Sequence, residues 1–260
     1  MCDGAGTCTH VANTAGCDAG PCVSGTCAAG ACVPGDALPA GTLCQTDDDL
    51  CTQESCDGHG ACVAGAPLDC GPCIRCDARA GCLAPQRPLA CDEMGASSRL
   101  DLVDGEDAAG DRMSWRWRRD TGIPALPDFG DPRDATTYEV CVYSEFPTGE
   151  ALVQRKRIAP AQSCDGSACW RSLRRGFAYD DHGGEQAGGI DRLRLRSSQN
   201  GRTQLRVDGR GPALGLTGPL TFLQNVSVDL LARDDAGERC WRARYPRPSL
   251  QTIERYRAAE

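Results

Sequence analysis

The stretch DRLRLRSSQNGRTQLRVDG, residues 191–209, decides the fold of the larger part of this chain. Its first half alternates two leucines with three arginines: Leu193 and Leu195 against Arg192, Arg194 and Arg196. Such two-residue alternation is typical of a strand with one apolar and one polar face. The Asn200-Gly201 pair that follows is the strongest short-range signal for a hairpin. The stretch therefore predicts two antiparallel strands with one buried face.

The same alternation recurs between residues 92 and 248, in short segments separated by Gly, Pro, Asp and Asn turns. The segments predict strands at roughly 98–104, 112–119, 136–144, 151–158, 174–180, 191–197, 203–208, 221–232 and 239–245. This spacing, without a long amphipathic helix, is typical of an antiparallel β-sandwich or jelly roll. We expect a β-sandwich domain over 92–248 and a C-terminal tail over 249–260, so the fold class is mainly β.

Cysteines and aromatic residues divide the 260-residue chain into two regions of different kind. Fifteen of the 19 cysteines lie in residues 1–91, whereas every Phe, Trp and Tyr lies between Trp115 and Tyr256. The first region has too little apolar area to offset an ordering cost of about 1–2 kcal/mol per residue. Disulfides stabilise by about 2–4 kcal/mol each and occur in exported proteins. We therefore expect a disulfide-rich, extracellular protein.

Cysteine spacing also divides residues 1–91 into repeats. CDGAGTC at 2–8 matches CDGHGAC at 56–62, and CDARAGC at 76–82 keeps the same gap. The expected boundaries are a partial unit at 1–16 and whole units at 17–43, 44–69 and 70–91. Because the first unit has only its second half, we expect the chain to be truncated at its N-terminus. The lack of a signal peptide before Cys2 is then explained.

Spacing alone does not determine which cysteines pair, since four cysteines allow three pairings. Candidates within one unit are Cys44, Cys51, Cys56 and Cys62. In the second region, Cys164 and Cys169 flank a short loop that a disulfide can close. Cys141 and Cys240 lie in predicted strands and are expected to join across the sandwich. Cys91 is then left over at the boundary between the two regions. It either closes the last repeat or pairs with a cysteine in the missing N-terminal part.

Two metal sites compete with these structural interpretations. The spacing of Cys70, Cys73 and Cys76 also suits a zinc or iron–sulfur site, although the neighbouring units have gaps better suited to disulfides. A carboxylate-rich loop is the candidate calcium site, with Asp101, Asp104, Asp107 and Asp111. The calcium-loop spacing is absent, so a solvated turn is the simpler interpretation. We expect no cofactor, with calcium as the alternative.

No catalytic constellation is recognisable, and we expect a non-enzymatic protein. The three histidines, His10, His59 and His182, lie in predicted loops, and no nucleophile elbow, HExxH or phosphate-binding loop occurs. Trp115 and Trp117 share one strand face, which is either core or a sugar-stacking platform. The arginine row defined by Arg192, Arg194 and Arg196 is either a solvated face or a contact for an acidic polysaccharide or other anionic surface.

The charge balance limits the partners. The chain has 36 acidic and 28 basic residues, a formal charge of −8. Residues 1–91 contribute most of this excess, with ten acids and three arginines. Nucleic acid is therefore not an expected partner, since phosphate binding needs a basic surface. No segment approaches the roughly 18 apolar residues of a membrane span.

Several motifs resemble those of known bacterial modules. The β-rich segment resembles a module of unknown function found in secreted or surface proteins of high-GC proteobacteria. The matching motifs are SWRW at 114–117, DFGDP at 128–132, YEVCVY at 138–143, ACW at 168–170, GFAYDD at 176–181 and CWRARY at 240–245. The repeats are similar to the CDGxGxC cysteine-rich repeats of myxobacterial-type extracellular proteins. These resemblances imply export to the exterior or cell surface of a bacterium, and no reaction.

Together these features predict an exported structural or adhesion-type protein. The repeats would act as a spacer for a β-sandwich that binds a surface, a glycan or a partner protein. One alternative is the accessory binding part of a larger secreted hydrolase. Another is a calcium-dependent binding module.

Overall fold

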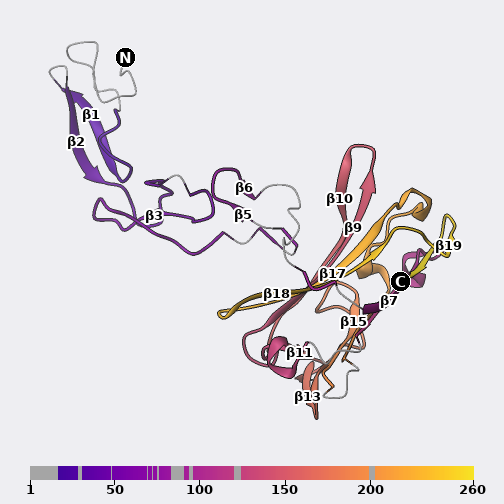
Figure 1. Cartoon of the computed structure of the whole chain (residues 1–260). Helices are drawn as coiled ribbons and strands as arrows, with labels where there is room; N and C mark the ends of the chain where they lie inside the picture. The colour runs from indigo at the N-terminus through magenta and orange to yellow at the C-terminus, as the bar shows by residue number, and fades with distance from the viewer. Residues whose placement is uncertain are drawn as a thin grey trace. The chain divides into compact units, whose positions relative to one another are not determined.

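The chain divides into two units, Met1–Gln86 and Arg87–Glu260, called here the repeat region and the β unit (Figure 1). The computed structural model describes residues 17–28, 31–47, 49–68, 70–71, 73–74, 76–82, 91–93, 96–119, 124–198 and 203–260. The expected partial repeat at 1–16 lies outside these residues. Cys91, expected at the end of the last repeat, belongs to the β unit.

The described residues of the repeat region form three short β-hairpins. They are β1 (Val23–Ala28) with β2 (Ala31–Ala37), β3 (Ser55–Cys56) with β4 (Cys62–Val63), and β5 (Cys76–Asp77) with β6 (Gly81–Cys82). Each hairpin places the third and fourth cysteines of a unit directly opposite each other: Cys27 and Cys32, Cys56 and Cys62, Cys76 and Cys82. The same register therefore recurs in all three described units.

The CDGxGxC motif forms the turn of such a hairpin. The Asp57 carboxylate accepts hydrogen bonds from the backbone N–H groups of His59 at 2.7 Å and Ala61 at 3.1 Å. These two bonds hold the pKa of Asp57 below its ordinary value. Gly58 and Gly60 have φ angles of +82° and +95°, a backbone region that glycine adopts without strain. The motif is therefore explained by turn geometry.

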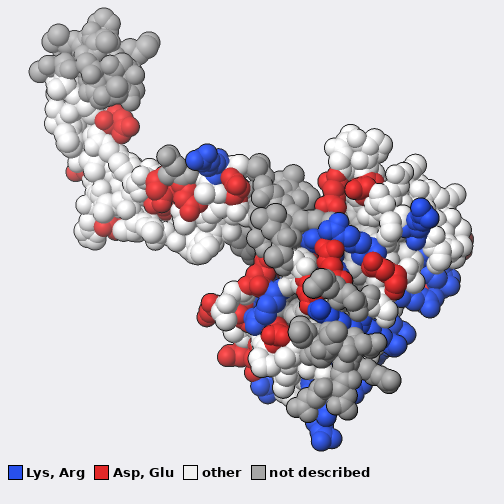
Figure 2. Space-filling model, viewed as in Figure 1, with Lys and Arg blue, Asp and Glu red and all other residues white. Residues whose placement is uncertain are grey.

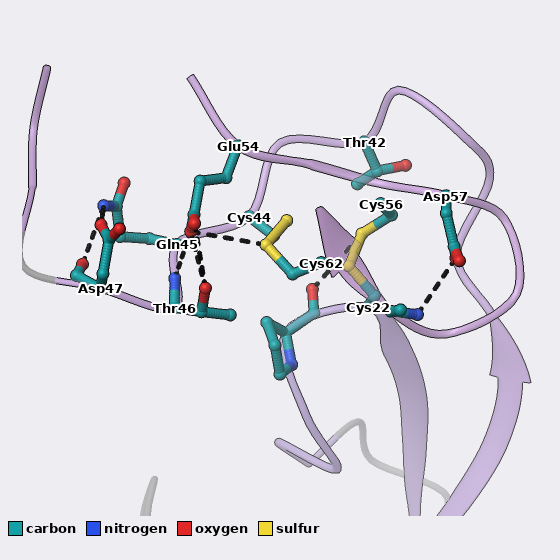
Figure 3. The surroundings of a disulfide bond; sticks show 12 residues. Cys22, Thr42, Cys44, Gln45, Thr46, Asp47, Glu54, Cys56, Asp57 and Cys62 are labelled. Atoms are coloured by element: carbon teal, nitrogen blue, oxygen red, sulfur yellow. Dashed lines mark hydrogen bonds between the residues drawn. A yellow bond between two sulfur atoms is a disulfide. The ribbon is translucent and has the colours of Figure 1, made fainter. Parts of the chain in front are cut away.

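The disulfides follow one rule along the repeat region. Within each unit the first cysteine bonds the fourth: Cys17–Cys32, Cys44–Cys62 and Cys70–Cys82. Between units the second cysteine bonds the third of the next: Cys22–Cys56 and Cys51–Cys76. Figure 3 shows the Cys22–Cys56 bridge beside the Cys44–Cys62 bridge. Adjacent units are thus joined by a disulfide as well as by the backbone.

All cysteines in the described part of the chain are in disulfides, including Cys27 and Cys73. The zinc or iron–sulfur alternative for Cys70, Cys73 and Cys76 is therefore wrong, because these sulfurs are oxidised and offer no thiolate. Such dense bridging indicates an oxidising, extracellular type of environment.

The β unit consists mainly of two antiparallel sheets. In spatial order, the eight-stranded sheet is β13 (Trp170–Leu173), β14 (Gly176–Asp180), β15 (Ile190–Arg196), β16 (Thr203–Arg210), β8 (Arg112–Arg119), β7 (Ala96–Val103), β20 (Arg255–Ala259) and β19 (Leu250–Gln251). The four-stranded sheet is β10 (Gly149–Ile158), β9 (Thr137–Phe146), β17 (Val226–Asp234) and β18 (Gly237–Tyr245). The shorter elements are the hairpin β11 (Ser163–Cys164) and β12 (Ser167–Ala168), and the 3-10 turns η1 (Ala108–Gly110), η2 (Leu126–Phe129), η3 (Pro212–Leu214) and η4 (Leu220–Phe222).

The predicted mainly β, sandwich-type fold is confirmed. The predicted hairpin is also present, since β15 pairs with β16 and Arg196 lies opposite Gln204. Its Asn200-Gly201 turn lies outside the described residues. The strand predicted at 174–180 is present as β14, but it begins only at Gly176, and β13 before it was not predicted. The predicted tail at 249–260 is wrong, because this segment forms β19 and β20.

The C-terminal segment is a strand because its side chains alternate. Tyr256 and Ala258 are fully buried, whereas Arg255 and Arg257 point to the other face. β20 pairs with β7 along its length and extends the large sheet.

The core lies between the two sheets and contains most of the aromatic side chains. Trp115 and Trp117 are completely buried there. The Trp115 indole N–H donates a 3.1 Å hydrogen bond to the Tyr245 hydroxyl, which joins the eight-stranded sheet to the four-stranded sheet. Leu193 and Leu195 face the same core, as their alternation with arginine predicts.

The disulfides of the β unit match one prediction and correct another. Cys164 pairs with Cys169 as expected. Cys240 pairs with Cys91, so the expected bridge between Cys141 and Cys240 is wrong. Cys141 on β9 and Cys240 on β18 lie in the same sheet with β17 between them. Their separation of two strand spacings, about 4.8 Å each, exceeds the reach of a disulfide.

The bridge between units predicts a simple outcome for proteolysis. A specific protease site introduced at the exposed Pro39-Ala40 pair lies between the first two whole units. Under non-reducing conditions, the cut chain should remain one covalent species because Cys22–Cys56 spans the cut. The double variant Cys22→Ser/Cys56→Ser should release two fragments on non-reducing gels.

The control variant Cys17→Ser/Cys32→Ser removes a bridge within one unit and should keep the cut pieces joined. Release of fragments from this control, or their retention in Cys22→Ser/Cys56→Ser, would contradict the assigned connectivity.

Burial of Trp117 predicts a stability effect. Trp117→Ala should lower the free energy of unfolding by about 3–5 kcal/mol because it empties a packed core site. Denaturant unfolding measures this effect. Arg118→Ala, at the exposed neighbouring position, should change the stability by less than about 0.5 kcal/mol. Unchanged stability of Trp117→Ala would show that the indole is not a core group.

Candidate functional site

The outward face of the eight-stranded sheet is rich in arginine. Residues directly opposite each other on neighbouring strands share a face. Four arginines are matched in this way across four neighbouring strands: Arg99 on β7, Arg116 on β8, Arg206 on β16 and Arg194 on β15. We call these four residues the arginine ladder. In Figure 2, basic side chains are prominent on the β unit, and acidic ones predominate on the repeat region.

A second row lies beside the ladder, two residues away along each strand. In strand order it consists of Ser97, Arg118, Gln204 and Arg196. Arg118 and Arg196 are exposed, and no residue of the row is acidic. Two adjacent rows of the face therefore carry six arginines without a carboxylate.

Most aspartates of this face lie in a third row, on the opposite side of the ladder, which we call the paired row. In strand order it contains Asp101, Ser114, Asp208, Arg192 and Asp180. Its carboxylates all form ion pairs. Asp101 contacts Arg255 and Arg257, Asp208 contacts Arg206, and Asp180 contacts Arg171 and Arg192.

The ion pairs of Asp101 and Asp180 shift the pKa values of these two aspartates. Burial alone would raise the pKa of Asp180. The hydrogen bonds from Arg171 and Arg192 lower it by more than burial raises it, so the net pKa is below its ordinary value. Asp101 behaves in the same way between its two arginines. Asp101 and Asp180 are thus ionised at neutral pH and already engaged.

The remaining arginines lack such partners. Within the described part of the chain, no ion pair to a carboxylate involves Arg99, Arg116, Arg118, Arg194 or Arg196. The Nε group of Arg194 is buried without a hydrogen-bond partner among the same residues. At the end of the ladder formed by Arg194 on β15 there is a hollow of about 540 Å³. It is lined by Leu173, Arg174, Arg175, Arg194 and Arg196. Unpaired positive charge is therefore concentrated on one continuous surface.

The structure divides the expected ligand residues into two groups. Trp115 and Trp117 have no exposed surface and cannot form a sugar-stacking platform. The row of Arg192, Arg194 and Arg196 does face outward, opposite the leucines. Arg192 is engaged with Asp180, whereas Arg194 and Arg196 belong to the unpaired surface.

The expected calcium residues serve other purposes. Asp101 is held by arginines, and Asp107 caps η1 through Gly110 N–H at 3.0 Å. Asp111 is buried and accepts the Gly105 N–H at 3.1 Å, which braces the loop. Among the described residues, only cysteine-containing groups bring three candidate ligands together, so Asp101, Asp104, Asp107 and Asp111 form no such cluster.

Arg99, Arg116 and Arg118 were missed in the sequence. Arg116 and Arg118 alternate with Trp115 and Trp117, which is the same signal that identified the leucine and arginine alternation. That pattern shows that the arginines face outward. Their alignment with Arg194 depends on the strand order, which places β8 beside β16.

A buried ion-pair network holds the entry segment of the β unit. Arg242 binds Asp229 with two hydrogen bonds of 2.7 Å, and it also donates to Glu93 at 3.1 Å. Burial alone lowers the pKa of Arg242, but the bonds and charge of Asp229 raise it more, so the net pKa lies above its ordinary value. With the nearby Cys91–Cys240 bridge, this network fixes the segment to β18.

Comparison with known proteins gives no relative: no protein-family model, curated protein or solved structure matches the chain. None of the helices in the described residues has the length and hydropathy of a membrane-spanning segment.

The Asp101 ion pairs predict an acid-dependent stability. Because the pKa of Asp101 is lowered by folding, its stabilising effect is present above its unfolded pKa of about 4 and is lost as the pH falls through the folded value. Asp101→Asn should therefore lower the melting temperature at pH 7 and flatten its decline toward about pH 3.

The charge-matched control Glu106→Gln, at an exposed position, should leave both the melting temperature and its pH profile unchanged. Calcium chloride should stabilise neither protein. A calcium-dependent rise in melting temperature that Asp101→Asn abolishes would contradict the ion-pair role.

Proposed function

We propose that this chain is an exported, non-enzymatic binding protein. Its repeats serve as a disulfide-linked spacer, and its β-sandwich binds an anionic surface or partner through the outward face of the eight-stranded sheet. The unpaired arginines of this face are the single observation that carries the proposal. The resemblance of the repeats and of the β-rich motifs to bacterial exported proteins supports a place outside the cell or on its surface.

The spacer role is supported by the covalent order of the repeat region. Every described unit is closed by one bridge and joined to its neighbour by another. A chain bridged in this way stays folded without a large apolar core. The bonds also keep the pieces joined after a backbone cut between Cys32 and Cys44, which suits a protein exposed to proteases.

The binding role is supported by the division of labour between the faces of the β unit. The inward face of the large sheet carries the leucines and tryptophans of the core. The ladder and the second row face outward, so their guanidinium groups can contact a partner without disturbing the core. Arginine forms paired hydrogen bonds with carboxylate, sulfate and phosphate groups, and this chemistry matches an anionic partner.

Secure attachment of the entry segment also supports the proposal. Cys91–Cys240 and the Glu93–Arg242–Asp229 network tie residues 91–93 to β18 in the four-stranded sheet. Force applied to the chain before residue 91 would therefore reach the four-stranded sheet through a covalent bond. The arginines on β7, β8, β15 and β16 belong to the other sheet.

Retention on polyanions tests the proposal. The oxidised full chain is passed over immobilised sulfated dextran, polyphosphate and neutral dextran at about 0.15 M ionic strength. We expect the sulfated dextran or polyphosphate column to retain the chain and higher salt to release it. The neutral dextran column should not retain the chain. Charge reversal in Arg116→Glu/Arg194→Glu should abolish retention.

The control Arg155→Glu/Arg247→Glu makes the same charge change at exposed positions outside the ladder and second row. This variant should still be retained. Passage of the wild-type chain through every polyanion column, or equal retention of the two variants, would rule the proposed binding face out.

A further inference from the structure

The arginine ladder has a direction, and this direction limits the shape of its ligand. Neighbouring strands lie about 4.8 Å apart, so four matched arginines extend for about 14 Å across the sheet, perpendicular to the strands. At the β15 end, Arg174 and Arg175 border the hollow next to Arg194 and Arg196. The positive surface is therefore long and narrow.

Like charges placed directly opposite each other on neighbouring strands destabilise a sheet. The ladder contains three such contacts in succession: Arg99 with Arg116, Arg116 with Arg206, and Arg206 with Arg194. Asp208 neutralises only Arg206, at 2.6 Å. A bound polyanion would relieve the repulsion along the whole ladder.

The second row adds groups suited to neutral hydrogen bonds. Ser97 and Gln204 alternate there with Arg118 and Arg196. A hydroxyl and an amide can donate to and accept from hydroxyl groups, whereas a guanidinium only donates. The two rows together thus offer a line of cations beside alternating cationic and neutral polar groups.

We propose that the ladder and the second row bind a linear acidic polysaccharide, carrying uronate or sulfate groups, whose chain lies across β7, β8, β16 and β15. The proposal rests on the proposed function and names the ligand class for the same face. The acidic groups pair with the ladder arginines, and the sugar hydroxyls contact Ser97 and Gln204. The paired row keeps its aspartates in ion pairs to one side, where they define the edge of the site.

Other polyanions fit this surface less well. Single-stranded nucleic acid is held by stacking on aromatic side chains, and no outward position of β7, β8, β15 or β16 is aromatic. Amphipathic membrane-binding surfaces combine basic groups with apolar side chains that insert, and the ladder and second row contain no such apolar side chain.

Binding of size-defined oligosaccharides tests the proposal. The probes are oligogalacturonates of one to eight residues, heparin oligosaccharides, neutral dextran oligomers, duplex DNA and phosphatidylglycerol vesicles. We expect the oxidised full chain to bind the longer acidic oligosaccharides and not the single sugar acid, because several arginines must be engaged at once. Binding should also raise the melting temperature.

Arg99→Ser/Arg116→Ser should weaken this binding by about tenfold or more, since two charge-assisted contacts are lost. Arg155→Ser/Arg247→Ser, with the same loss of charge, should weaken it by less than about twofold. The first variant should melt at the same temperature as the wild type or higher, because like-charge contacts are removed. A weakened complex is then not a sign of misfolding.

The outcomes separate this inference from the proposed function. Binding of oligogalacturonate, heparin fragments or both supports the inference and identifies the acidic group. Preference for DNA or vesicles overturns the inference but leaves an anion-binding face. Equal weakening by both variants, or equal affinity for one sugar and for eight, also overturns it. Failure to bind any polyanion overturns both.

Discussion

Disulfide bonds take the place of an apolar core in the first part of this chain, and the rest of its organisation depends on that substitution. The strands of the hairpins in the repeat region are only two to seven residues long and contain no aromatic side chain. Short isolated hairpins are marginally stable in water. In the second and third hairpins, one cysteine is bonded to the preceding unit and the other to the first cysteine of the same unit. Each hairpin is thus held in place by covalent bonds, some of which reach the neighbouring unit.

The β unit solves the stability problem in a different way. Its two sheets bury the aromatic residues between them, and the core needs only the inward face of each strand. The outward face of the eight-stranded sheet is therefore free to carry charge. The aspartates lie in the paired row and, as Asp191, beside it, where each is engaged by arginine. This arrangement leaves the ladder and second row positive. A chain with a net negative charge can thus present a local basic face to an anionic partner.

Alternation and turn signals predicted most strands because they act over a few residues. The segment at 112–119 matches β8, and the Leu193 and Leu195 face lies in the core. Longer-range features were harder to predict. The side chains of β20 alternate, but its place in the sheet depends on pairing with β7, which is far away in the sequence. The partner of Cys240 depends on which strands are neighbours, and the sequence does not contain that information locally.

The candidate site shows the same division between local and long-range information. The sequence by itself determined that the arginines at 192, 194 and 196 face away from the leucines, and that the first region must be bridged by cysteines. Only the tertiary structure decided that Trp115 and Trp117 are core, that Arg192 is neutralised by Asp180, and that Arg99 and Arg116 continue the row of Arg194. The physical reason is that side-chain direction follows from the two-residue repeat of a strand. Register across a sheet and the pairing of cysteines depend instead on contacts between residues far apart in the chain.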